Sequence, residues 1–187
     1  MGSGQSGERD DNGFNGIILF DYFKVTAGGF YYVTKDTSVI INIESENELQ
    51  RISDIGQHTG AKPAVAIRVN PAFELKNSGM KMGGGAKPFG IDEELVPGIL
   101  SRPELREMDF KGFHIFCGSQ NLNSDAIVEA QKKTVQLALN LADLAPQPVS
   151  WLNIGGGLGI PYFPGEARLN VGAIGESLAG LSEQLFS

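Results

Sequence analysis

Short apolar runs alternate with amphipathic stretches through most of the chain, and this alternation limits the folds available to it. The apolar runs are "SVIINIES", "AVAIRVNP", residues 112–117 and "VSWLNI". Helical spacing follows each run, at about 45–60, 92–100, 125–144 and 171–185. Such alternation is typical of an α/β protein with parallel strands joined by crossover helices. A doubly wound sheet and a (β/α)8 barrel both remain open. Because a barrel takes about 250 residues, this chain would hold about half of one.

Two of the expected helices carry start signals. Ser45 and Glu48 form a capping box, and the helix that follows is expected to bury Leu49, Ile52 and Ile55 and to end near Gly60. Ser124 is the candidate N-cap of the helix 125–144, whose apolar stripe consists of Ile127, Ala130, Leu137, Leu141 and Leu144. The glycine-rich loop 72–90 has a length that is typical of functional segments.

Composition excludes several classes of protein. A net charge of −7 without any basic block argues against a nucleic-acid partner. No stretch reaches the roughly 18 apolar residues of a membrane span, and Cys117 is the single cysteine, which suits a cytoplasmic protein. Residues 1–13 are expected to be disordered or an appended segment. Residues 14–37 are apolar and unassigned, and 38–187 would form the partial barrel domain.

The turn in "WLNIGGGLGIPY" follows an apolar strand and contains Gly155, Gly156 and Gly157. Consecutive glycines can turn several backbone amides toward one anion. The pattern does not match a dinucleotide fingerprint, because position 160 is Ile and Pro161 obstructs the helix that should follow; no P-loop lysine is present either. A single phosphate monoester fits this turn, and a tight turn without any ligand fits it equally well.

Polar residues near the ends of neighbouring strands strengthen the phosphate interpretation. Arg68, His114 and Ser119 fall at or just past the strand ends, and the carboxyl ends of parallel strands form the active face of a barrel. Taken singly, each has an ordinary structural explanation: a buried ion pair for Arg68, a satisfied core histidine for His114 and a turn cap for Ser119.

Five motifs carry a family resemblance. "INIESENEL", "AIRVNP", "KPFGI", "GFHIFCGSQ" and "LNIGGGLGIPY" occur in this order over residues 38–187. The chain thereby resembles the ornithine/diaminopimelate/arginine decarboxylases, pyridoxal-phosphate (PLP) enzymes of fold type III with an alanine-racemase-like barrel. The apolar segment 14–37 does not match this family's pattern. "NSGMKMGGGAKPFG" and "FHIFCGSQNL" look most like the subgroup associated with exosortase A systems.

The resemblance assigns cofactor-binding roles to seven residues. Gly155, Gly156, Gly157 and Ser119 would contact the PLP phosphate, and Arg68 would lie in a polar network near the cofactor. Phe116 stands where the family has a histidine that stacks on the pyridine ring, and a phenylalanine also supplies a flat face. His114 matches an earlier histidine of the diaminopimelate branch. Asn153 stands where many relatives have Asp, and Cys117 is expected to be a packed side chain.

The resemblance places the remaining catalytic parts outside the chain. The family's Schiff-base lysine would lie upstream, so no catalytic residue is assigned; Lys24 is only 17 residues before Ile41 and lacks the Ala-Asn that should follow it. The acidic partner of the pyridine nitrogen and a C-terminal β domain that completes a homodimer would lie downstream. The chain would therefore be an inactive fragment of an amino-acid decarboxylase whose substrate is free or carrier-bound. A non-catalytic PLP-binding module and an unrelated phosphate-sugar barrel enzyme are the alternatives.

Overall fold

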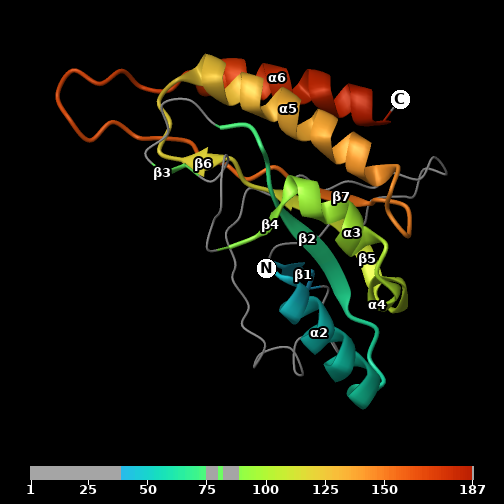
Figure 1. Ribbon diagram of the computed structural model, residues 1–187. Helices are drawn as coiled ribbons and strands as arrows, with labels where there is room; N and C mark the ends of the chain where they lie inside the picture. Colours follow the sequence, from blue (N-terminus) through green and yellow to red (C-terminus); the bar gives the residue numbers. More distant parts are fainter. Residues whose placement is uncertain (1–38, 75–79, 82–88, 187) are drawn as a thin grey trace, which may run out of the picture.

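The computed structural model describes residues 39–74, 80–81 and 89–186 (Figure 1). The strands are β1 (Ile41–Ile43), β2 (Ala64–Asn70), β3 (Met80–Lys81), β4 (Ile91–Asp92), β5 (Asp109–Ile115), β6 (Gly118–Ser119) and β7 (Trp151–Asn153). The helices are α2 (Glu46–Thr59), the 3-10 turn η2 (Glu93–Leu95), α3 (Val96–Leu100), α4 (Pro103–Glu107), α5 (Ser124–Ala142) and α6 (Val171–Phe186). The expectations for 1–13, for 14–37 and for Lys24 lie outside the described residues.

The main sheet is parallel, and its strands follow one another in chain order, β1-β2-β5-β7. The short strand β4 pairs with the last two residues of β2, past the part of β2 that pairs with β1. Sequential order distinguishes the two architectures that the sequence left open, because a doubly wound sheet reverses its order at a switch point. The observed order is that of consecutive strands in a barrel, so the expected α/β fold, a part of a (β/α)8 barrel, is confirmed.

The two faces of the sheet differ in chemistry because successive residues of a strand point to opposite sides. One face is apolar and forms a single core with side chains of the surrounding helices; its members include Val65, Ile67, Val69, Phe113, Ile115 and Leu152. The opposite face carries Arg68, His114 and Asn153 side by side on three neighbouring strands. In a barrel the face without helices is the interior, so these polar side chains point inward.

The capping box at the start of α2 is confirmed. The Glu48 N–H donates to Ser45 Oγ at 3.2 Å, while the Glu48 carboxylate accepts from the Glu44 N–H at 2.8 Å, one residue earlier than in the ideal motif. The helix ends at Gly60 in a left-handed conformation with φ 66°. Of its expected inward residues, Leu49 and Ile52 are buried and Ile55 is partly buried.

The predicted N-cap of α5 is wrong by one residue. Asn123 caps the helix, and its side-chain oxygen accepts from the Ala126 N–H at 3.0 Å. Ser124 is the first helical residue, and its hydroxyl instead accepts from the Asn170 N–H at 3.0 Å, next to the start of α6. Both residue types cap helices well, so composition alone does not decide between neighbours. The Ser124 contact links α5 to α6, which lie side by side in Figure 1.

The predicted end of α5 is also corrected. The helix stops at Ala142, so Leu144 lies beyond it and is 55% exposed. The other members of the stripe are buried, namely Ile127, Ala130, Leu137 and Leu141.

Three other boundaries differ from expectation. The strand expected at 112–117 runs from Asp109 to Ile115, because residues 118–119 leave the sheet and pair with β3 instead. The helix expected at 92–100 is divided into η2 and α3, with a proline at the N-terminus of α3. In "VSWLNI" only Trp151–Asn153 is strand.

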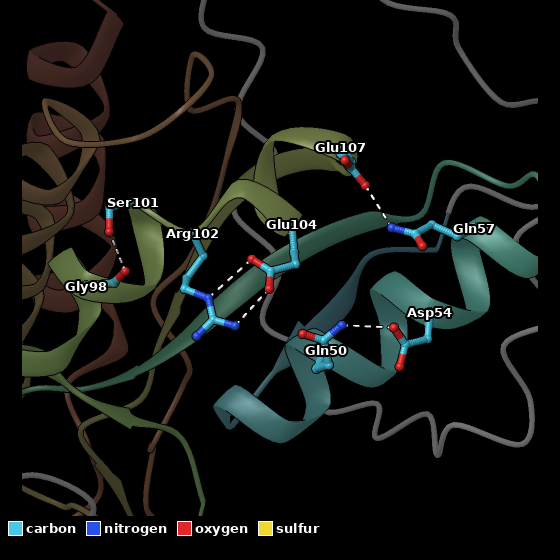
Figure 2. A network of polar contacts seen from close by, with 8 residues as sticks. All are labelled: Gln50, Asp54, Gln57, Gly98, Ser101, Arg102, Glu104 and Glu107. Atoms are coloured by element: carbon cyan, nitrogen blue, oxygen red, sulfur yellow. Dashed lines mark hydrogen bonds and ion pairs between the residues drawn. The ribbon is translucent and has the colours of Figure 1, made fainter.

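Polar contacts lie on the outer surfaces of α2 and of the α3–α4 region (Figure 2). Gln57 of α2 donates to Glu107 of α4 at 3.1 Å in an exposed bond, and the half-buried Arg102 donates to both carboxylate oxygens of Glu104 at 2.8 and 3.2 Å. The bond from Arg102 lowers the pKa of Glu104 below its ordinary value. Pairs this close to solvent add little to stability. This surface belongs to the helices and not to the inner face of the sheet.

Gly112 allows β5 and β7 to approach each other. Its φ is 147°, and a Cβ there would collide with the backbone oxygen of Trp151, at a point where the pairing of β2 with β5 is shifted. We predict that Gly112→Ala lowers the free energy of unfolding by about 3 kcal/mol, because β5 and β7 must move apart or the alanine must keep a strained backbone. Urea denaturation measures this effect.

Gly98→Ala is the matched control for Gly112→Ala. Gly98 lies in α3 with open space where its Cβ would be, so alanine should leave stability unchanged or raise it by up to about 1 kcal/mol. Equal unfolding free energies for the two variants would contradict the proposed role of Gly112.

Candidate functional site

The glycine turn follows β7 directly, and two of its glycines are required by their surroundings. Gly155 and Gly157 have φ of 69° and 68°, a left-handed conformation that side chains rarely adopt. A Cβ on Gly155 would lie 2.6 Å from the Phe116 ring, and one on Gly157 would collide with the carbonyl oxygen of Gly118. Gly156 differs, because nothing lies within 4 Å of its Cβ position. The turn therefore packs tightly on both sides and is open at its middle.

Backbone hydrogen bonds fasten this turn to the segment after β5. The Asn121 N–H donates to the Gly157 carbonyl at 3.0 Å, and the Gly159 N–H donates to the Asn121 carbonyl at 2.8 Å. Gln120, with φ 56°, is the one non-glycine residue of the described ranges with positive φ, and it makes the bend that brings Asn121 to the turn. Ser119 consequently lies beside Gly157, with its Cα 3.7 Å from the Cβ position there.

The three glycine amides are not equivalent. The Gly155 N–H donates to Asn153 Oδ1 at 2.8 Å, so the end of β7 already uses it. The amides of Gly156 and Gly157 donate to no atom of the described residues. This side-chain role of Asn153 was missed in the sequence. An Asn two residues before a turning glycine is a known turn former, and that spacing was the available signal.

Arg68 is buried on the inner face and ion-paired. Its Nη1 lies 3.0 Å from Glu44 Oε1, and the two side chains are only 8% and 16% exposed. The guanidinium also lies 5.7 Å from the centre of the Phe89 ring, while its buried Nε has no hydrogen-bond partner within the described ranges of the chain. Glu44 was missed by the sequence analysis. The signal was its place directly after β1, since Ile43 pairs with Ile67 and the next residues therefore meet.

His114 is held neutral beside Arg68. Asn42 Nδ2 lies 3.2 Å from His114 Nδ1, and because an amide nitrogen only donates, Nδ1 accepts and the ring proton resides on Nε2. Burial, and then the positive charge of Arg68, lowers the pKa of His114 to about 4. Its ring centre lies 6.4 Å from that of Phe116. The neutral imidazole of His114 thus lies between Arg68 on the inner face of the sheet and the Phe116 ring just past the end of β5.

Cys117 is a packed side chain, as expected. It is 7% exposed and its Sγ lies 3.3 Å from Thr134 Oγ1. Burial raises the pKa of the thiol to about 11, so a thiolate is not formed at neutral pH.

Other kinds of site find no support within the described part of the chain. No group of three or more His, Cys, Asp or Glu side chains there is placed to bind a metal ion. In the same ranges, no helix combines the length and the apolar character that crossing a membrane requires.

All seven residues named from the sequence lie at one end of the sheet or on its inner face. The structure brings Phe116 and Ser119 against Gly155 and Gly157, and it places His114 and Arg68 in the adjoining row. The site therefore presents two open amides, a hydroxyl-bearing residue and an aromatic ring at the carboxyl ends of β5 and β7. A flat aromatic molecule with a phosphate matches this set of groups.

The shifted pKa of His114 predicts a pH dependence of stability. The unfolded chain takes up a proton near the ordinary pKa of 6.5, whereas the folded chain does so only near 4. Stability is therefore unaffected above pH 6.5 and falls as the pH decreases from 6.5 to 4, by up to about 3 kcal/mol. Replacing His114 by Gln should remove this fall, as measured by urea denaturation across that pH range.

His58→Gln is the control, because His58 is the other histidine of the chain and is exposed on α2. This variant should retain the fall in stability. Parallel curves for the parent chain and the His114 variant would show that His114 is not the group responsible.

Comparison with known proteins supports a specific family. The family model described as "Pyridoxal-dependent decarboxylase, pyridoxal binding domain" matches residues 18–187. The match begins inside the segment 14–37, for which the motifs gave no assignment. Most of the chain is therefore covered by a model of a cofactor-binding domain.

Curated relatives and a solved structure agree with this match. L-glutamyl-(BtrI acyl-carrier protein) decarboxylase of Niallia circulans is 36% identical over 132 residues, covering 70% of this chain and 31% of the relative. Diaminopimelate decarboxylase of Aquifex aeolicus is 34% identical over 128 residues, covering 67% and 30%. The crystal structure of diaminopimelate decarboxylase from Helicobacter pylori with L-lysine superposes with a TM-score of 0.66 at 25% identity, covering 79% and 37%.

The chain thus spans about a third of the length of these relatives. Its fold and its sequence agree with the same domain. The cofactor implied by this domain is PLP. The chain belongs to the pyridoxal-dependent decarboxylase family.

Proposed function

We propose that this chain is the phosphate-binding and ring-binding part of a PLP-dependent amino-acid decarboxylase. The observation that carries the proposal is the junction of Ser119 with the glycine turn, where the amides of Gly156 and Gly157 have no described acceptor. A phosphate dianion placed there would accept from these amides and from the Ser119 hydroxyl. Bonds from neutral donors to a charged acceptor are stronger than ordinary ones.

The residues present fit this cofactor. The open space at the Cβ position of Gly156 is the kind of cradle that a phosphate oxygen requires. Asn153 holds the turn through the Gly155 amide without placing a carboxylate beside the phosphate. The Phe116 ring rests against Gly155 and offers a face on which a pyridine ring can stack.

When bound, PLP supplies the electron sink that decarboxylation of an amino acid needs. The residues of this chain bind and orient it. Phe116 holds the ring without a titratable group, so it transfers no proton. His114 is neutral and keeps its proton on Nε2, and Arg68 has its charge paired with Glu44. We infer that both residues hold the inner face in a fixed arrangement next to the ring.

We infer further that the chain alone binds PLP without a covalent bond and does not decarboxylate. The support for this is the resemblance, which expects the covalent lysine further upstream of the five motifs than Lys24 lies. Incubation with PLP, borohydride reduction and peptide mapping should therefore find no uniquely modified lysine. Stoichiometric modification of one lysine, for example Lys24, would contradict this inference; phosphate binding without modification is also what a non-catalytic PLP-binding module would show.

The substrate class follows from the relatives. Two of them are decarboxylases named for diaminopimelate or for an L-glutamyl group on an acyl-carrier protein. We therefore propose an α-amino acid, free or carrier-bound, as the substrate of the complete enzyme. Association with exosortase A systems, a homodimer and a cytoplasmic location stay predictions.

Gly156 offers the sharpest test of the phosphate site. A Cβ at position 156 meets no atom within 4 Å, and the carboxylate of an aspartate there would place a negative charge where the phosphate should bind. Gly156→Asp should weaken PLP binding at least about 100-fold, equivalent to about 3 kcal/mol, with an unchanged melting temperature. Isothermal titration calorimetry with PLP measures the affinity.

Gly180→Asp adds the same charge at an exposed, open position in α6 and should leave the affinity unchanged. Equal losses in both variants would indicate an effect of net charge alone. Unchanged PLP binding by the Gly156 variant would reject the proposed site.

A further inference from the structure

A small cavity lies between α5 and the rear of the glycine turn. Its volume is about 20 Å³, and its walls include Phe116 just after β5, Gly118 of β6, Gln131 and Thr134 from α5, and Gly156 from the turn itself. One water molecule needs roughly 10–15 Å³ of such space. The cavity therefore has room for one water in contact with both the helix and the turn.

Gln131 is the unexplained residue of this cavity. Its side chain is only 7% exposed, and its Oε1 has no hydrogen-bond partner among the residues that the structure describes. It occupies the buried side of α5 among apolar neighbours such as Ile127 and Ala138, where a leucine or methionine would pack without loss. A buried amide oxygen without a partner is unfavourable, so a glutamine here requires a partner that the protein side chains do not provide.

We propose that Gln131 is a positioning residue for the glycine turn: a water in this cavity donates one hydrogen bond to Gln131 Oε1 and the other to the backbone carbonyl of Gly156, which leaves the Gly156 amide for the phosphate. Thr134 also lines the cavity, but its hydroxyl contacts Cys117 Sγ and makes no hydrogen bond to Gln131 Oε1. The link reaches the turn at Gly156, between the residues that approach Phe116 and Gly118 closely. Gly156, the one glycine of the three that no neighbour fixes by close approach, is thereby held.

The consequence for phosphate binding rests on the proposed function. A turn whose middle residue is held in advance loses less freedom on binding an anion and so binds it more tightly. Gln131 would then influence affinity for the phosphate group without contacting the phosphate. A glutamine that only fills space would have no such effect on the affinity for the phosphate group.

Hydrogen exchange of the ligand-free chain tests the positioning role. Gln131→Met keeps the size and shape of the side chain and removes the acceptor. It should accelerate exchange of the hydrogen-bonded amides of Gly155 and Gly159 at least tenfold relative to the amide of Ile67 in the core, as followed by NMR. The reference to Ile67 separates local opening from any change in global stability. An unchanged ratio would overturn the proposal.

Two further variants serve as controls. Gln136→Met makes the same change at an exposed position of α5, where the side chain only bonds Asn140 at 3.0 Å, and should leave the ratio unchanged. Gln131→Glu keeps an acceptor oxygen at the same place and should keep exchange within about threefold of the parent chain. Tenfold acceleration in this variant as well would argue for packing, and not the acceptor, as the cause.

A binding experiment separates this inference from the proposed function. Gln131→Met should weaken PLP binding at least tenfold and leave the binding of pyridoxal, which has no phosphate, unchanged. If the parent chain binds no PLP while exchange responds as expected, the proposed function fails and the positioning of the turn stands. If exchange responds but the Met variant binds PLP as the parent does, the link between the held turn and phosphate affinity is rejected.

Discussion

The close backbone contact between the glycine turn and the segment after β5 is the constraint on which the site depends. No Cβ fits between Gly157 and the Gly118 carbonyl, and Asn121 bonds to both Gly157 and Gly159. These contacts join the ends of two strands that are separate in sequence and bring Ser119 next to the turn. Without them the hydroxyl and the open amides would belong to independent loops, and no single anion could bind both.

The sheet that carries this junction has one face that stabilises the fold and another that carries the polar side chains of the site. Its outer face is apolar and buried against the helices, so the strands are fixed by packing. Its inner face is polar, and the side chains there are fixed by one another: Arg68 by Glu44, and His114 by Asn42. Burial keeps the imidazole neutral next to a charged guanidinium. A polar inner face near the strand ends is expected where a barrel binds a charged ligand and not only packs its own core.

The sequence predicts the parts of this structure that depend on local pattern. Alternating apolar and amphipathic stretches predict parallel strands, but only the observed strand order distinguishes a barrel from a doubly wound sheet. Asn123 and Ser124 are equally good N-caps, so only the hydrogen bonds in the structure show which of them begins α5. Glu44 could not be paired with Arg68 without the register of two strands. Gln131 appears in the sequence as an ordinary surface glutamine, because its burial depends on the turn that packs above it.

A crystal structure of the chain with PLP would show directly whether the junction of Ser119 with the glycine turn binds the phosphate. We expect phosphate oxygens within hydrogen-bond distance of the amides of Gly156 and Gly157 and of Ser119 Oγ, with the pyridine ring lying on Phe116. A phosphate bound elsewhere, or a Ser119 hydroxyl turned away from a phosphate that the turn holds, would contradict it.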